Sequence, residues 1–159
     1  MSNEFPDRPP IYHDAWRLAI VASEYNSTYV EGLVKFASDE LSLLLPESNF
    51  ATLRVPGSFE IPLGTKIVIE TLNVHAVLAF GLLFDGETMH AGLIAGAVTK
   101  ALLDLSLTHR VPVLHEVLVC KTPDQAKERC LMPEINRGTE AARAAVRIVL
   151  ALRHILKEG

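Results

Sequence analysis

The chain consists of short apolar runs separated by longer segments in which apolar residues recur at helical spacing. The clearest run covers residues 76–83, where every position is apolar or glycine. It is too short for a typical helix, and we predict that it is a fully buried strand. Runs at 17–22, 50–55 and 111–119 predict three more strands.

The segments between these runs have apolar residues every three to four positions, which is typical of helices that pack by one face. Polar residues suited to helix capping precede three of them: Asn26 or Ser27, Ser58, and the turn 122–124. The predicted helices run from Asn26 or Ser27 to about Leu45, from Phe59 onward, over 91–107, from Thr122 to about Cys130, and over 138–156.

Strands that alternate with helices through short turns predict an α/β fold with a central four-stranded parallel sheet covered on both faces. We expect an extended N-terminal arm at 1–14, followed by a single domain at 15–159. Residues 1–10 contain three prolines and are expected to be extended or disordered. Residues 11–15 are expected to form an extra edge strand, able to pair with a neighbouring subunit.

Composition narrows the class of protein. The formal net charge of -4 over 159 residues argues against a general nucleic-acid surface, which needs a basic face. Cys120 and Cys130 form neither a disulfide framework nor a metal-ligand pattern, and Cys120 is expected to be a buried small hydrophobe. The N-terminus lacks a signal-peptide layout, and no apolar run reaches membrane-spanning length. We therefore expect a soluble cytoplasmic protein.

Candidate chemistry follows the run at 76–83, where Gly86 to His90 connect the strand to the next helix. The carboxyl ends of parallel strands are where open α/β sheets bind ligands, and a helix start offers free N–H groups to an anion. Thr88 adds a hydroxyl, and His90 adds a side chain suited to proton transfer near neutral pH. The alternative is an ordinary helix start with an incidental surface histidine.

Other polar and aromatic residues also follow strands. Tyr25 follows the first, Ser58 to Glu60 follow the second, and Arg129 and Arg137 follow the fourth with its short helix. Tyr25 could instead be a half-packed surface aromatic, Glu60 could only complement the helix dipole, and the arginines could be solvated. Two loops that supply anion-binding groups favour a phosphorylated or anionic substrate.

Several motifs together resemble the 6,7-dimethyl-8-ribityllumazine synthase family. They are Arg54-Val55-Pro56-Gly57-Ser58-Phe59-Glu60-Ile61-Pro62, Gly86-Glu87-Thr88 with His90, Glu128-Arg129, and Asn136-Arg137-Gly138 with Glu140, within a match from about Arg17 to Leu152. The resemblance implies the penultimate step of riboflavin synthesis, in which 5-amino-6-(D-ribitylamino)uracil condenses with 3,4-dihydroxy-2-butanone 4-phosphate. It also implies a flavodoxin-like α/β/α sandwich, and homopentamers or their multiples with active sites shared between subunits. No cofactor, metal, nucleic acid or membrane is implied.

The resemblance also implies residue roles. His90 is the catalytic proton-transfer residue, Tyr25 stacks on the pyrimidine, and Arg129 pairs with the phosphate, which a guanidinium can grip by two parallel hydrogen bonds. Ser58, Phe59 and Glu60 bind the ribityl chain, Glu87 and Thr88 contact the phosphate, and His115 covers the heterocycle of a neighbouring subunit. The full expected substrate-binding set is Tyr25, Asn26, Ser58, Phe59, Glu60, Leu82, Leu83, Phe84, Glu87, Thr88, His115, Arg129, Arg137 and Glu140.

Some positions depart from the family pattern. Asp85 replaces a common basic residue, residues 91–93 replace aromatic and acidic ones, Arg137 replaces a lysine, and His115 replaces an aromatic. Two alternatives to the enzyme therefore stay open. One is a homologue that binds a flavin or lumazine with little or no turnover, and the other is a protein whose main use is its assembly into a shell.

Overall fold

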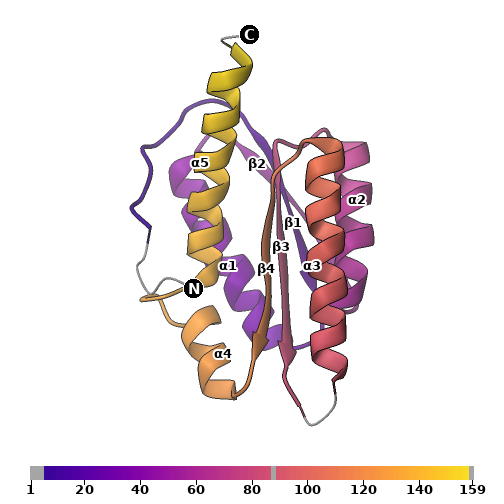
Figure 1. Cartoon of the computed structure of the whole chain (residues 1–159). Helices are drawn as coiled ribbons and strands as arrows, with labels where there is room; N and C mark the ends of the chain where they lie inside the picture. Colours follow the sequence, from indigo (N-terminus) through magenta and orange to yellow (C-terminus); the bar gives the residue numbers. More distant parts are fainter. Residues whose placement is uncertain (1–5, 87–88, 158–159) are drawn as a thin grey trace.

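The computed structural model describes residues 6–86 and 89–157, within which four strands alternate with helices (Figure 1). The elements in chain order are β1 (Arg17–Ser23), α1 (Ser27–Leu44), β2 (Asn49–Val55), the 3₁₀ turn η1 (Ser58–Glu60), α2 (Ile61–Leu72), β3 (Ala76–Phe84), α3 (His90–His109), β4 (Val113–Cys120), α4 (Pro123–Cys130) and α5 (Arg137–Lys157).

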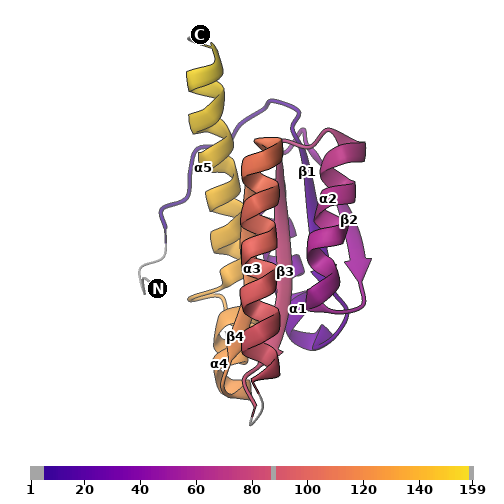
Figure 2. The same ribbon diagram turned by 45° about the vertical axis from the view of Figure 1, so that its right-hand side comes forward.

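The four strands form one parallel sheet in the order β2-β1-β3-β4. Helices α2 and α3 cover one face, and α1, α4 and α5 cover the other, as the two views show (Figures 1 and 2). Each layer has its own apolar core: Ile20 and Phe80 point toward α1 and α5, whereas Val21 and Val98 belong to the core under α2 and α3. The α/β prediction with a four-stranded parallel sheet is confirmed.

The predicted strands are all present, with small differences at their ends. The fourth begins at Val113 rather than at Val111, because Pro112 has no N–H to donate to the ladder. The Pro112 carbonyl still accepts a hydrogen bond from the Val77 N–H at 2.9 Å. Since all four strands run the same way, their carboxyl ends meet at one edge of the sheet, which is where open α/β sheets form ligand-binding crevices.

Of the three predicted caps, only the one before α4 is confirmed. There the Thr122 hydroxyl accepts a hydrogen bond from the Gln125 N–H at 3.2 Å. Asn26 occupies the N-cap position of α1 in a left-handed conformation, but its side chain makes no cap hydrogen bond. Ser58 does not cap α2 either, because it lies inside η1, where burial directs its hydroxyl toward the sheet. Both cap predictions were therefore wrong.

The segment before the sheet is held against the rest of the protein by side-chain contacts and a backbone hydrogen bond. Residues 11–15 form no strand in this chain, so that prediction was wrong; pairing with a neighbouring subunit stays a prediction. Tyr12 donates its N–H to the Leu44 carbonyl at 2.8 Å and stacks on Trp16. Arg8 forms an ion pair with the buried Glu40 of α1. These contacts, rather than a sheet ladder, hold the arm.

Candidate active site

The loops after β1 and β2 meet at the carboxyl edge of the sheet. Gly57 lies between them: a side chain there would begin 3.1 Å from the Tyr25 ring and 3.0 Å from a Glu60 carboxylate oxygen. The Gly57 N–H donates to that carboxylate at 2.9 Å. Tyr25 and Phe59 are 70% and 62% exposed, and Glu60 is exposed as well, so two aromatic rings and a carboxylate are accessible on these loops.

The end of β3 is tied to the same loops. The Asn26 amide donates to the Leu82 carbonyl at 2.8 Å, which uses the side chain that was expected to cap α1. Ser58 lies so close to β3 that a side chain on Gly81 would approach its hydroxyl to 2.7 Å. Phe84 packs edge to face against Tyr29 of α1. Leu83, half-buried, borders the core under α3.

His90 is the first residue of α3 and is exposed. It makes no hydrogen bond or ion pair with any residue that the structure describes, so its imidazole is available to a ligand. Asp85 and Gly86, which follow β3, are exposed as well. Glu87 and Thr88, predicted to contact the phosphate, lie outside the described residues.

A second group of predicted residues lies at the β4 edge, on α4 and the start of α5. Arg129 is half-buried and forms no ion pair among the described residues. Arg137 is buried and pairs with Glu140 one turn later. Asn136 positions both helices: its amide donates to the Cys130 carbonyl at 2.9 Å, and its oxygen accepts from the Gly138 N–H at 2.9 Å. It thereby caps α5.

His115 stands apart from both groups. It lies on β4 opposite Ala79 of β3, and its Nε2 is 2.9 Å from the Thr99 hydroxyl of α3. Its ring therefore lies on the α3 side of the edge strand, whereas Arg129 and Arg137 belong to the α4 and α5 side. Within one chain no hydrogen bond or ion pair between described side chains links His115, Arg129 or Arg137 to Tyr25, Phe59 or Glu60.

Glu116 of β4 is a charged residue that the sequence analysis missed. It is half-buried, and burial raises the pKa of its carboxyl to about 7, with Arg137 and Arg129 opposing that rise and Glu140 adding to it. The signal was present in the sequence, because a glutamate interrupts the apolar positions Leu114 and Leu118 on one face of a strand. Carboxyls with raised pKa values near arginines are common at functional sites.

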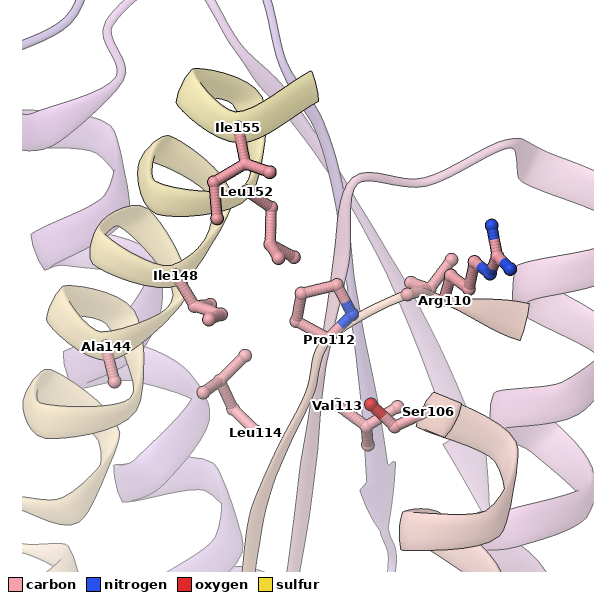
Figure 3. A pocket seen from close by; sticks show the side chains of 10 residues that line it. Ser106, Arg110, Pro112, Val113, Leu114, Ala144, Ile148, Leu152 and Ile155 are labelled. Carbon is pink, nitrogen blue, oxygen red and sulfur yellow. The ribbon is translucent and has the colours of Figure 1, made fainter. Parts of the chain in front are cut away.

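A groove of the described surface lies elsewhere, near the amino end of β4 (Figure 3). It has a volume of about 550 Å³ and lies between the end of α3, β4 and the projecting part of α5. Pro112 and Leu114 face Ile148, Leu152 and Ile155 across it. Its lining is mostly apolar, with Ser106 and Arg110 as the polar members, so it offers a surface for packing more than groups for chemistry.

The two cysteines are free and buried, as predicted for Cys120. Burial raises the pKa of Cys130 to about 12, which keeps it a thiol rather than a nucleophilic thiolate. Among the described residues, no cluster of three or more histidine, cysteine, aspartate or glutamate side chains could hold a metal ion. The described residues of these groups offer exposed aromatic faces at Tyr25 and Phe59, a half-buried guanidinium at Arg129, and titratable side chains at His90 and Glu116.

Known proteins are similar to this chain in sequence over most of its length. A family model described as 6,7-dimethyl-8-ribityllumazine synthase matches residues 15–153. A protein of that name from Halorhodospira halophila is 36% identical over 140 residues, covering 87% of this chain and 90% of its own. Another from Flavobacterium johnsoniae is 36% identical over 134 residues, covering 84% and 70%. This chain belongs to the 6,7-dimethyl-8-ribityllumazine synthase family.

Proposed function

We propose that the protein is a 6,7-dimethyl-8-ribityllumazine synthase that condenses 5-amino-6-(D-ribitylamino)uracil with 3,4-dihydroxy-2-butanone 4-phosphate. The observation that supports this most is the group of exposed side chains at the carboxyl edge of the sheet, where Tyr25 and Glu60 both lie against Gly57 and Phe59 precedes Glu60. Aromatic faces suit a planar pyrimidine, and a carboxylate suits the hydroxyls of a ribityl chain. The remaining roles follow the family resemblance.

The condensation needs a phosphate site and a proton-transfer group. Arg129, with no ion pair among the described residues, suits a phosphate better than a guanidinium already neutralised by a carboxylate. His90, exposed at the start of α3, suits the loss of water, the elimination of phosphate and the ring closure, each of which moves a proton. Glu87 and Thr88 complete the proposed phosphate contacts.

We further propose that copies of the chain share the active site, in homopentamers or multiples of them. Arg129 and His115 lie on the β4 side of the chain, whereas Tyr25 and Phe59 follow β1 and β2. Neighbouring copies could therefore complete each other's sites. Exposed leucines at 93, 103 and 107 of α3 support packing between copies, as does the apolar groove beside β4 (Figure 3).

Helix α3, at 20 residues, is long and apolar enough to cross a membrane by length and composition alone, although no run of that length was expected from the sequence. We attribute this character to contact with other copies. A cytoplasmic location stays a prediction, as does the division into an arm at 1–14 and a domain at 15–159. Sedimentation of the native protein tests the assembly, and an active monomer would contradict the shared site.

Turnover of the two substrates by the purified protein tests the proposed activity, because the lumazine product is fluorescent. Replacing Arg129 by alanine removes a charge-assisted hydrogen bond worth roughly 1.5–3 kcal/mol. We expect KM for the butanone phosphate to rise about ten- to a hundredfold, with a much smaller rise for the pyrimidine. Equal effects on both substrates would remove Arg129 from the phosphate site.

The departures at Asp85 and His115 favour one alternative, a protein that binds a lumazine or flavin without turnover. The His90→Ala variant separates the two functions. In the enzyme its turnover number falls, by roughly 10²–10⁴-fold for the loss of one acid–base group, while ligand affinity stays nearly constant. If the unaltered protein forms no fluorescent product from the two substrates but binds a lumazine or flavin tightly, the protein is a binding protein instead.

A further inference from the structure

Glu116 interrupts an apolar row on the edge strand. Side chains alternate along β4, so Leu114, Glu116 and Leu118 share the face that packs against α4 and α5. Leu114 borders the apolar groove and Leu118 belongs to the core. A carboxyl between them is costly to ionise unless it gains a partner. No described residue donates a hydrogen bond to it, so its charge depends on what lies nearby.

Charged neighbours of Glu116 come from α4 and α5, two of the helices that cover this face. Arg137 and Glu140 of α5 and Arg129 of α4 act on Glu116 through space. Arg137 is 8% exposed, and its Nε is buried without a hydrogen-bond partner among the described residues. Arg129 forms no ion pair there. Two guanidiniums with unused donors thus share one region with a carboxyl that has no bonded partner.

We propose that Glu116 is a positioning residue that sets the anion affinity of Arg129 according to its own charge. This inference rests on the proposed function, since it treats Arg129 as the phosphate ligand. When ionised, Glu116 neutralises part of the field of the two arginines and repels a dianion. When protonated, it leaves that field to the substrate phosphate. Arg129 is the group that touches the anion, and Glu116 acts through it.

The sign of the pH dependence follows from the charge. With its pKa raised to about 7 by burial, Glu116 is mostly neutral below that pH and mostly ionised above it. Anion affinity is therefore expected to fall as the pH rises from 6 to 8. By reciprocal linkage, a bound anion also favours the protonated carboxyl. Coupling of this kind usually changes affinity about 5–150-fold, and the partial exposure of Glu116 places it near the lower end.

Other titratable groups face the same region or the same ligand. Cys130 is close enough to Glu116 for the two groups to interact through space, but burial raises the pKa of its thiol, and of the Cys120 thiol on the same strand, so both stay neutral. Glu140 is paired with Arg137. His115 points to the opposite face of β4, and His90 starts α3. Histidines also gain charge as the pH falls, with the same sign of effect on an anion, so the test needs a histidine control.

Sulfate is a suitable probe because it stays a dianion between pH 6 and pH 8, whereas a phosphate monoester titrates near pH 6. We would measure sulfate dissociation constants by calorimetry on the native assembly across this range. In the unaltered protein, binding is expected to weaken about five- to tenfold from pH 6 to pH 8. In Glu116→Gln it should stay at the tight value throughout, and Glu116→Asp should restore the pH dependence.

The controls are His90→Gln and His115→Gln, which should keep the pH dependence of sulfate binding. Loss of that dependence in either histidine variant, its survival in Glu116→Gln, or the absence of any sulfate binding would overturn the inference. Turnover is assayed on the same preparations. A protein with no turnover whose pH-dependent sulfate binding disappears in Glu116→Gln would refute the proposed enzyme but retain the role of Glu116.

Discussion

Two glutamates of this protein lie near a pair of arginines each, but their charges behave in opposite ways. Glu40 of α1 is 5% exposed and accepts hydrogen bonds from Arg8 at 2.8 and 2.9 Å and from Arg143 at 2.7 Å. Burial pushes its pKa up, but these two arginines outweigh burial and lower it. Glu116 of β4, with Arg137 and Arg129 nearby but no bonded donor, has its pKa raised to about 7.

The difference shows that direct contact, rather than the number of nearby positive charges, decides whether a buried carboxyl stays ionised. Hydrogen bonds to the charged form favour it strongly, whereas charges acting through several ångströms of protein and water favour it weakly. Glu40 therefore suits a permanent structural contact. Glu116 instead suits a role in which the carboxyl changes its charge near pH 7.

The largest effect on stability is expected from Glu40→Ala. The substitution leaves the buried Arg143 without its acceptor on α1, and breaking a buried ion pair from one side costs about 3–5 kcal/mol. We expect a loss near 3 kcal/mol, because Arg8 can turn to solvent. Urea unfolding at fixed protein concentration measures it. The matched control, Asp39→Asn, removes an exposed pair with Lys35 and should cost less than about 0.5 kcal/mol.

The contact should also depend on pH. The lowered pKa of Glu40 means that its contribution is present above the unfolded-state value of 4.5 and is lost as the pH falls through the lower folded-state pKa. A Glu40→Ala protein as stable as the unaltered one at pH 7 would contradict the view that hydrogen bonding to arginine is what distinguishes Glu40 from Glu116.

The opposite result is expected from Glu116→Gln. A pKa raised from 4.5 to about 7 means that the folded protein pays for ionising this carboxyl, by roughly 3 kcal/mol at 1.36 kcal/mol per pH unit. The penalty is absent below pH 4.5, grows as the pH rises, and is complete above pH 7. Glutamine is also polar and buried, so we expect the variant to gain about 1–2 kcal/mol at pH 8 and nothing at pH 4.5.

Urea unfolding at several pH values distinguishes this effect from a simple change of packing, which would not vary with pH. Glu134→Gln is a suitable control, because Glu134 is exposed on the loop between α4 and α5. Its substitution should leave stability unchanged at each pH. A Glu116→Gln protein that is less stable than the unaltered one at pH 8 would indicate that the carboxylate has a bonded partner.

The smallest effect is expected from Arg8→Ala. Arg8 is exposed and lies on the arm, and Arg143 remains bonded to Glu40 without it. Global stability should therefore change within experimental error. Local protection should fall instead, seen as faster amide hydrogen exchange in residues 6–12, especially at the Tyr12 N–H bonded to Leu44. Unchanged exchange there would show that the other contacts of the arm, among them the Tyr12–Trp16 stack and the Arg143 bond to the Pro6 carbonyl, hold it without Arg8.

The pattern of apolar residues was enough to predict the order and type of the main elements, because helical and strand periodicities are local properties of the chain. The run at 76–83 is a strand in the structure, and residues 91–107 are helical. The motifs around Ser58, His90 and Arg129 were enough to indicate the family. The arrangement of those residues in space was not, because it depends on how strands and loops far apart in the sequence pack together.

The polar contacts were decided by tertiary structure. Asn26 bonds to Leu82, 56 residues away, instead of capping α1, and Glu40 bonds to Arg143, 103 residues away. No local pattern encodes partners so distant in sequence. The same holds for Glu116, whose position on β4 was plain from the sequence but whose ionisation depends on burial and on arginines supplied by α4 and α5. Burial and bonded partners exist only once the chain has folded, and they determine whether the same carboxyl group acts as a fixed anchor or as a titrating charge.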